Sequence, residues 1–222
     1  MPRTKNKSKV RVLIVDDHPA VREALATRIS RQPDLEVCGE AGDVREALTM
    51  IDDLRPDLAV IDISLKLDSG IELIKRIKDR HDGIRILVWS MHNELHYAER
   101  ALRAGALGYI NKDQATDRII EAIRRVLDGK VYLSDELAEK MLHRSVGDRN
   151  ELARLPIDSL ADRELEVFRL IGHGVKTAEI ANRMHLSIKT IETYRDRIRQ
   201  KLGLKDGTEL AYFATMWTLQ GE

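Results

Sequence analysis

The sequence has a single cysteine, no net charge and no long apolar run, and each absence narrows what the chain can be. A disulfide framework is excluded because Cys38 stands alone, and its place in an apolar segment predicts a buried structural thiol. With 37 basic and 37 acidic residues, the overall charge gives no indication of a nucleic-acid partner. The longest apolar stretches have the length of a strand, so we expect a cytoplasmic protein with no membrane partner.

The first nine residues are basic and have no apolar core. Segment 1–9 therefore does not read as a secretory signal, and it predicts a short flexible tail. The full 222 residues give room for one large domain or two small ones.

Between residues 10 and 128, five short apolar segments rich in Val, Ile and Leu alternate with helical patterns. The segments lie at 10–16, 35–40, 57–62, 84–90 and 107–111. The residues between them repeat with the 3.6-residue period of amphipathic helices, and Asp43 and Ser69 precede two of these helices as expected caps. The alternation predicts βαβ units, and hence a doubly wound α/β domain whose parallel sheet is buried on both faces.

Polar residues follow four of these strands at the point where each strand ends. They are Asp16, Asp17, Asp62, Ser90 and Lys112. The carboxyl ends of parallel strands line one crevice, so we expect the five side chains to meet there. Three neighbouring carboxylates repel one another unless a cation neutralises them, and an oxygen-only site suits Mg²⁺. Asp62 could then act as a nucleophile toward a phosphoryl group, with Lys112 stabilising the transferring oxygens.

Each of these signals is weak when taken alone. A strand-terminal Asp often caps a helix, and a lysine at a strand end is usually solvated. His18, beside the acid pair, is expected to be a surface residue rather than a metal ligand, because the site already has hard oxygen donors. The coincidence of all the polar residues at strand ends is what favours a phosphoacceptor site.

After residue 128 the alternation of strands and helices stops. Segment 129–156 predicts a linker with a short helix at 134–144, and its polar part, 145–156, is the expected hinge. Residues 157–222 carry no strand signal. They carry four helical segments, at 162–172, 177–184, 188–202 and 207–219, which predict a small all-α domain.

Positive charge in this second domain is concentrated on one helix. Segment 187–205 has six basic and two acidic residues, whereas the whole of 156–222 has ten of each. A helix with concentrated positive charge is typical of one that lies between the phosphates of a major groove. A solvated amphipathic helix in a bundle is the alternative that the charge pattern alone leaves open.

Several short motifs resemble a known family. VDDH, VIDISL, VWSMHNE and GYINKD resemble the landmarks of bacterial receiver domains, and residues 160–204 resemble the LuxR-type helix-turn-helix. Together they resemble the NarL/FixJ-type response regulators of two-component systems. The fold that this resemblance implies is a flavodoxin-like (βα)5 receiver domain at 10–128, joined to a four-helix DNA-binding domain at 157–222.

The resemblance implies a role for each residue of the strand-end site. Asp62 would be phosphorylated by a sensor histidine kinase, and Lys112 would pair with the phosphate. Asp17 and Asp62 would bind Mg²⁺ together with the backbone carbonyl of Ser64, and Asp16 would assist through water.

The resemblance also implies a switch. Ser90 would be the hydroxyl that moves to bond the phosphate, and Tyr109 the aromatic that turns inward when Ser90 moves. One departure from the family is the segment from Leu65 to Gly70, which stands where Met-Pro-Gly is common and predicts a less rigid loop.

In the second domain the resemblance implies contacts with DNA. Glu192, Thr193 and Asp196 correspond to positions that face bases, and Lys189 and Arg197 are better placed for phosphates.

Two features bear on how stable this domain is and how it associates. Ala161 and Lys176 stand where the family has helix caps, so the domain is expected to be marginally stable alone. The last helix, around 210–219, would be the surface of a homodimer that forms on phosphorylation.

The prediction is therefore a phosphorylation-gated transcription regulator rather than an enzyme. Three alternatives stay open from the residues alone. The first is a DNA-binding regulator with a vestigial receiver, and the second is a receiver whose helical domain docks proteins. The third is an aspartyl-phosphate phosphohydrolase, which usually has an acid where this chain has Ser64.

Overall fold

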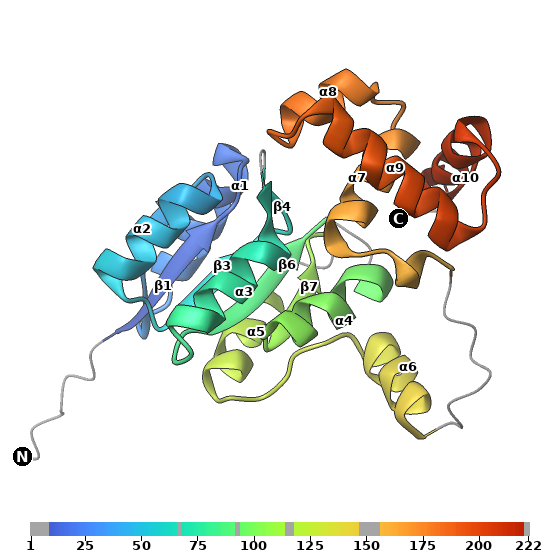
Figure 1. Cartoon of the computed structure of the whole chain (residues 1–222). Helices are drawn as coiled ribbons and strands as arrows, with labels where there is room; N and C mark the ends of the chain where they lie inside the picture. Colours follow the sequence, from blue (N-terminus) through green and yellow to red (C-terminus); the bar gives the residue numbers. More distant parts are fainter. Residues whose placement is uncertain (1–8, 66–67, 92–93, 114–117, 147–155, 220–222) are drawn as a thin grey trace, which may run out of the picture. The chain divides into compact units, whose positions relative to one another are not determined.

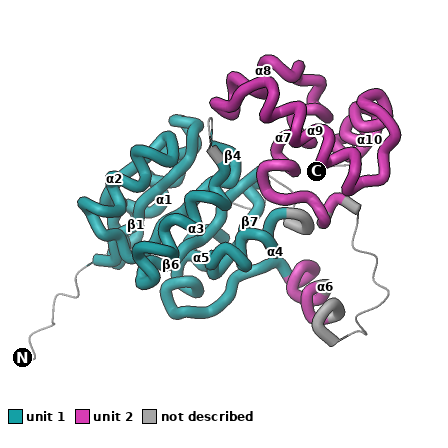
Figure 2. The backbone as a smooth tube through the Cα atoms, in the orientation of Figure 1, with its two compact units in different colours: residues 1–134 teal, residues 135–222 magenta. Residues whose placement is uncertain are grey.

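The computed structural model describes residues 9–65, 68–91, 94–113, 118–146 and 156–219 (Figure 1). The chain forms two compact units, residues 1–134 and 135–222 (Figure 2). Within the described residues, we find no helix with both the length and the apolar character needed to cross a membrane.

The first unit is built on a five-stranded parallel sheet, as the sequence predicts. Its strands are β1 (Val10–Val15), β2 (Leu35–Ala41), β3 (Leu58–Ile61), β6 (Arg85–Ser90) and β7 (Gly108–Asn111), in the spatial order β2-β1-β3-β6-β7. The reversal of strand order beside β1 makes the sheet doubly wound, and the carboxyl ends of β1 and β3 meet at this switch point.

Helices cover both faces of this sheet (Figure 1). They are α1 (Pro19–Ser30), α2 (Val44–Leu54), α3 (Gly70–Arg80), α4 (Glu94–Ala104) and α5 (Arg118–Leu127). One core lies between the sheet and the pair α1 and α5, where Leu25, Ile29 and Ile123 are fully buried. Burial on both faces explains why β1 and β3 are continuous apolar runs rather than alternating ones.

One local expectation is confirmed and two are wrong. The Asp43 carboxylate caps α2 by accepting from the Glu46 amide at 2.8 Å, but the Ser69 hydroxyl makes no cap on α3. Cys38 in β2 is half-buried rather than fully buried, and this burial raises the pKa of its thiol.

Two short pairings in the first unit were not expected. Strands β4 (Ser64–Leu65) and β5 (Asp68–Ser69) form a small antiparallel hairpin directly after Asp62. Beyond α5, Tyr132 pairs with the edge of β7 as an isolated bridge to Gly108. The Tyr109 amide donates to the Tyr132 carbonyl at 2.9 Å, so the chain that leaves this unit is bonded to β7.

The second unit is helical. It contains α6 (Asp135–Val146), a 3₁₀ turn η1 (Pro156–Ser159), α7 (Asp162–Gly172), α8 (Thr177–Arg183), α9 (Ile188–Leu202) and α10 (Gly207–Leu219). Phe168 of α7 is fully buried, with ring centroids 5.9 Å from Phe213 and 5.6 Å from Trp217 of α10. Gly172 lets α7 and α10 approach closely, because a Cβ at this position would lie 2.1 Å from Thr218 Oγ1.

Candidate phosphoacceptor site and nucleic-acid interface

The fold brings the five predicted strand-end residues to one edge of the sheet. Asp16 and Asp17 follow β1, Asp62 follows β3, Ser90 ends β6, and Lys112 follows β7. Asp16, Asp62 and Ser90 are buried although they are polar. Buried polar groups need partners, and these residues supply them to one another.

Lys112 is the centre of charge compensation at this edge. Its Nζ lies 2.5 Å from Asp16 Oδ2 and 2.6 Å from Asp62 Oδ2, and 5.4 Å from the centroid of the Trp89 ring. Burial alone would lower the pKa of the ammonium, but the carboxylates of Asp62 and Asp16 outweigh it and raise the pKa above its ordinary value. Lys112 is therefore a cation at neutral pH.

Both carboxylate oxygens of Asp62 have partners. Oδ2 binds Lys112, while Oδ1 accepts the Ser90 hydroxyl at 2.7 Å and the Ser64 amide at 3.3 Å. The carboxylate is thereby held in one orientation at the end of β3. Gly70 packs directly against the backbone of Asp62, and a larger residue would not fit, because a Cβ there would lie 2.1 Å from the Asp62 carbonyl oxygen.

The acidic side of the site has the composition of a cation site. Four residues, Asp16, Asp17, His18 and Asp62, each place one possible ligand atom here. These four atoms all lie within 4.8 Å of one another. The three carboxylates are the hard oxygen donors that Mg²⁺ prefers, so the residues present fit that ion. His18 is exposed at the surface, as expected, and one of its ring nitrogen atoms also belongs to this cluster.

Tyr109 lies in β7, where its position pairs with Val88 of β6, two residues before Ser90. Its side chain is fully buried. A buried Tyr109 ring and the Ser90–Asp62 hydrogen bond occur together in this structure.

Helix α9 presents all five predicted nucleic-acid contacts to solvent. They are Lys189, Glu192, Thr193, Asp196 and Arg197. The opposite face of the helix is anchored in the core, where Ile191 and Ile198 are fully buried. The Ser187 hydroxyl caps the helix by accepting from the Thr190 amide at 3.0 Å.

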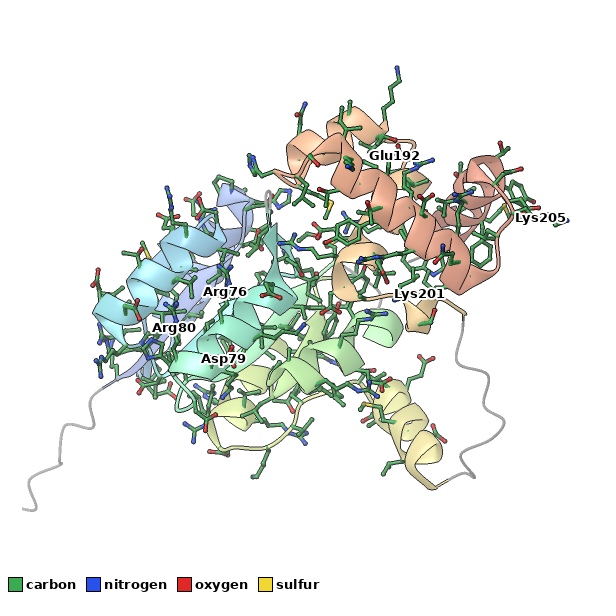
Figure 3. The ribbon with its side chains drawn as sticks, in the orientation of Figure 1. Arg76, Asp79, Arg80, Glu192, Lys201 and Lys205 are labelled. Atoms are coloured by element: carbon green, nitrogen blue, oxygen red, sulfur yellow. The ribbon has the colours of Figure 1, made fainter. Side chains whose placement is uncertain are left out.

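Not all the charge counted on this helix is free for a ligand. Asp196 pairs with Arg199 at 2.5 Å, and Glu192 pairs with Arg195 at 3.6 Å. Figure 3 labels Glu192 in the first half of α9 and Lys201 near its end. Across the described parts of the chain, no ion pair is found for Lys189 or Arg197, which leaves these two cations for an anionic partner.

Lys201 is partly exposed, but its ammonium is bound within the second unit. Its Nζ lies 2.5 Å from Oε2 of the buried Glu164 in α7, and the same oxygen accepts the Ala161 amide at 2.8 Å. Ala161 and Lys176 make no side-chain cap, as the sequence predicts. Glu164 instead ties the start of α7 to the end of α9, a connection that no local sequence pattern reveals.

The two halves of the chain match two families. Residues 12–124 match the response regulator receiver domain, and residues 158–214 match the bacterial regulatory proteins of the luxR family. Together with the parallel sheet and the helical unit, these matches define a two-component response regulator with a LuxR-type DNA-binding domain. The chain belongs to the NarL/FixJ-type response regulators.

Similarity to individual proteins extends over nearly the whole chain. The DNA-binding transcriptional activator DevR/DosR of Mycobacterium tuberculosis is 34% identical over 206 residues, covering 93% of this chain and 94% of that protein. The transcriptional activator protein ExaE of Pseudomonas putida is 35% identical over 206 residues, covering 91% and 94%. RcsB of Salmonella enterica, in a structure bound to the promoter rprA with the phosphomimetic BeF3⁻, is 26% identical with a TM-score of 0.66, covering 94% and 99%.

Proposed function

We propose that this response regulator is controlled by phosphorylation: Asp62 accepts a phosphoryl group from a sensor histidine kinase, and the modification gates DNA binding by α9. The observation that carries the proposal is the pair of contacts at Asp62, with the Ser90 hydroxyl at 2.7 Å on one oxygen and the Lys112 ammonium at 2.6 Å on the other. In this proposal residues 10–128 are the receiver, 129–156 the linker and 157–222 the DNA-binding domain of a cytoplasmic protein.

The chemistry follows from a carboxylate nucleophile. An oxygen of Asp62 attacks the phosphorus of a phosphohistidine, a P–O bond forms, and the P–N bond breaks with its electron pair leaving on the imidazole. Mg²⁺ bound by Asp17, Asp62 and the Ser64 carbonyl, with Asp16 acting through water, would neutralise negative charge on the incoming group.

The two groups now bonded to Asp62 are the ones a phosphoryl group needs. Attack requires a free oxygen on Asp62, so Lys112 or Ser90 must leave that oxygen. Lys112 then binds a phosphoryl oxygen as a cation, and the Ser90 hydroxyl donates to another. Ser90 and Tyr109 are the proposed switch residues, and phosphorylation acts by favouring one of two arrangements of the chain.

The proposed DNA contacts lie on the exposed face of α9. Lys189 and Arg197 would contact phosphates, and Glu192, Thr193 and Asp196 would face base edges. Support comes from the promoter-bound RcsB structure and from the exposure of all five side chains.

We assign α10 to a homodimer that forms on phosphorylation. Its buried side consists of Leu210 and Ala214, while Tyr212, Met216 and Leu219 are exposed by 69%, 37% and 76%. A stripe of large apolar side chains in water favours association. A related structure contains RcsB dimers bound to DNA. On this basis, Tyr212→Ala should weaken the dimer measured by sedimentation without lowering the melting temperature.

The test is DNA binding by the full chain with and without a small-molecule phosphodonor. The probe is a duplex selected from a random pool by phosphodonor-treated protein. Treatment should strengthen binding by wild type but not by Asp62→Asn. Lys189→Ala combined with Arg197→Ala should weaken binding in both states, with Lys130→Ala in the first unit as the matched control. Equal stimulation of Asp62→Asn would refute the proposed acceptor, and equal binding in all states would favour a regulator with a vestigial receiver.

A further inference from the structure

His18 places a nitrogen atom at the edge of the acidic site. Its Nδ1 lies 2.7 Å from Asp17 Oδ1 and 3.4 Å from Asp16 Oδ1. The imidazole is 67% exposed and could extend into solvent, yet it is turned toward the two carboxylates. It therefore belongs to the same set of converging donor atoms as Asp16, Asp17 and Asp62.

The backbone of His18 is held on both sides. Its amide donates to Asp16 Oδ1 at 2.9 Å, and its carbonyl accepts from the amides of Val21 and Arg22 at 3.1 Å each, at the start of α1. Pro19 follows, which restricts His18 to the extended conformation that it has here, with φ −95° and ψ 108°. The ring therefore projects from a fixed point, so a cation would not have to order this part of the chain.

The donor set differs in kind from an oxygen-only site. Carboxylate and carbonyl oxygens suit Mg²⁺, whereas imidazole nitrogen suits Zn²⁺, Fe²⁺ and Ni²⁺. We propose that His18, through Nδ1, is a ligand of a divalent transition-metal ion held with Asp17 and Asp62, so that the receiver site accepts such ions in addition to Mg²⁺. This inference rests on the proposed cation site at Asp62.

The competing explanation is a simple surface ion pair between His18 and Asp17. In that case the imidazole would contribute nothing to cation choice. The two explanations differ in what happens at the ring nitrogen when a transition ion binds, which makes them separable by experiment.

The experiment uses the full chain, freed of metal with a chelator, and titrates it with MgCl2 and separately with chelator-buffered ZnCl2. Binding is followed by calorimetry, and the ring ¹⁵N resonances of the histidines are followed by NMR. The His18 signals are identified by their absence in His18→Ala. His185→Asn is the matched control, because His185 is an exposed histidine in the second unit whose positive φ of 51° asparagine tolerates.

We expect His18→Ala to lower the ratio of Zn²⁺ affinity to Mg²⁺ affinity at least about tenfold, and His185→Asn to leave that ratio unchanged. In the wild type, Zn²⁺ should shift the Nδ1 resonance of His18. An unchanged ratio in His18→Ala, or a stationary Nδ1 resonance while Zn²⁺ binds, would overturn the inference.

Asp17→Asn separates this inference from the proposed function. Suppose that Asp17→Asn loses Mg²⁺ binding while His18→Ala keeps the wild-type ratio of Zn²⁺ affinity to Mg²⁺ affinity. That result would support the proposed cation site and reject His18 as a ligand. Absence of Mg²⁺ binding in the wild type would count against the proposed cation site itself. Absence of binding by either ion would overturn both.

Discussion

Replacing Lys112 by methionine should destabilise the first unit far more than replacing an exposed lysine does. The side chain is 7% exposed and its Nζ compensates two buried carboxylates, Asp16 and Asp62. Removing one partner of a buried ion pair costs about 3–5 kcal/mol, because it leaves uncompensated charge. Asp16 keeps the hydrogen bond from the His18 amide, and Asp62 keeps those from the Ser90 hydroxyl and the Ser64 amide, so the expected loss of stability is about 3 kcal/mol.

The assay is urea unfolding in metal-free buffer, followed through the fluorescence of Trp89. Because Trp217 would add the signal of the second unit, all variants carry Trp217→Phe. The matched control is Lys130→Met, which removes an exposed lysine 3.7 Å from Asp128 and should cost less than about 1 kcal/mol.

Two results would refute the reasoning about Lys112. One is a decrease in the free energy of unfolding for Lys112→Met that is no larger than the decrease for Lys130→Met. The other is a decrease that Mg²⁺ does not reduce, since a cation bound among the same carboxylates should replace part of the missing positive charge.

Three further predictions concern the same two units. Gly70→Ala should lower the stability of the first unit by about 1–3 kcal/mol, because the new Cβ would overlap the backbone of Asp62. Gly83→Ala is the control and should not destabilise the unit, because a Cβ there would meet nothing within 4 Å. Equal melting temperatures for the two variants would contradict this prediction. Lys201→Met should lower the stability of the second unit by about 2 kcal/mol, because it leaves the buried Glu164 without its cation. The loss is smaller than for a fully buried pair because Lys201 is partly exposed. The melting temperature followed through Trp217 should fall further than for Lys205→Met, and equal falls would contradict a stabilising role for the pair. Since the pKa of Lys112 is raised in the folded state, its contribution to stability is complete below about pH 10.4, its unfolded value, and is lost as pH rises through the higher folded value. Wild type should therefore show an alkaline loss of stability in the first unit that Lys112→Met lacks, and parallel pH profiles would contradict the shift.

Much of the first unit was predictable because its signals are local. A parallel strand buried on both faces must be a continuous apolar run, so VRVLIV and DLAVI indicate β1 and β3 without knowledge of their neighbours. The rule that strand ends share one edge then brings Asp62 and Lys112 together, although they are 50 residues apart.

The missed features depend on contacts that have no period in the sequence. The pair of the buried Glu164 and the partly exposed Lys201 joins residues 37 apart, so Lys201 was counted in the positive charge of segment 187–205 although it is bound within the domain. The bridge at Tyr132 and the two-residue strands β4 and β5 are too short to leave a pattern. His18 lies at the surface as expected, but the position of its ring beside the acidic cluster depends on the turn before Pro19, which residue type alone does not reveal.

The most direct test of the account is phosphate incorporation from a small-molecule phosphodonor, resolved on phosphate-affinity gels. Wild type and Asp62→Asn are treated with and without Mg²⁺. The account predicts a shifted band that requires Mg²⁺ and appears in wild type but not in Asp62→Asn, because Asp62 is a carboxylate nucleophile with Lys112 and Ser90 on its two oxygens. A band of equal intensity in Asp62→Asn, or none in wild type, would contradict it.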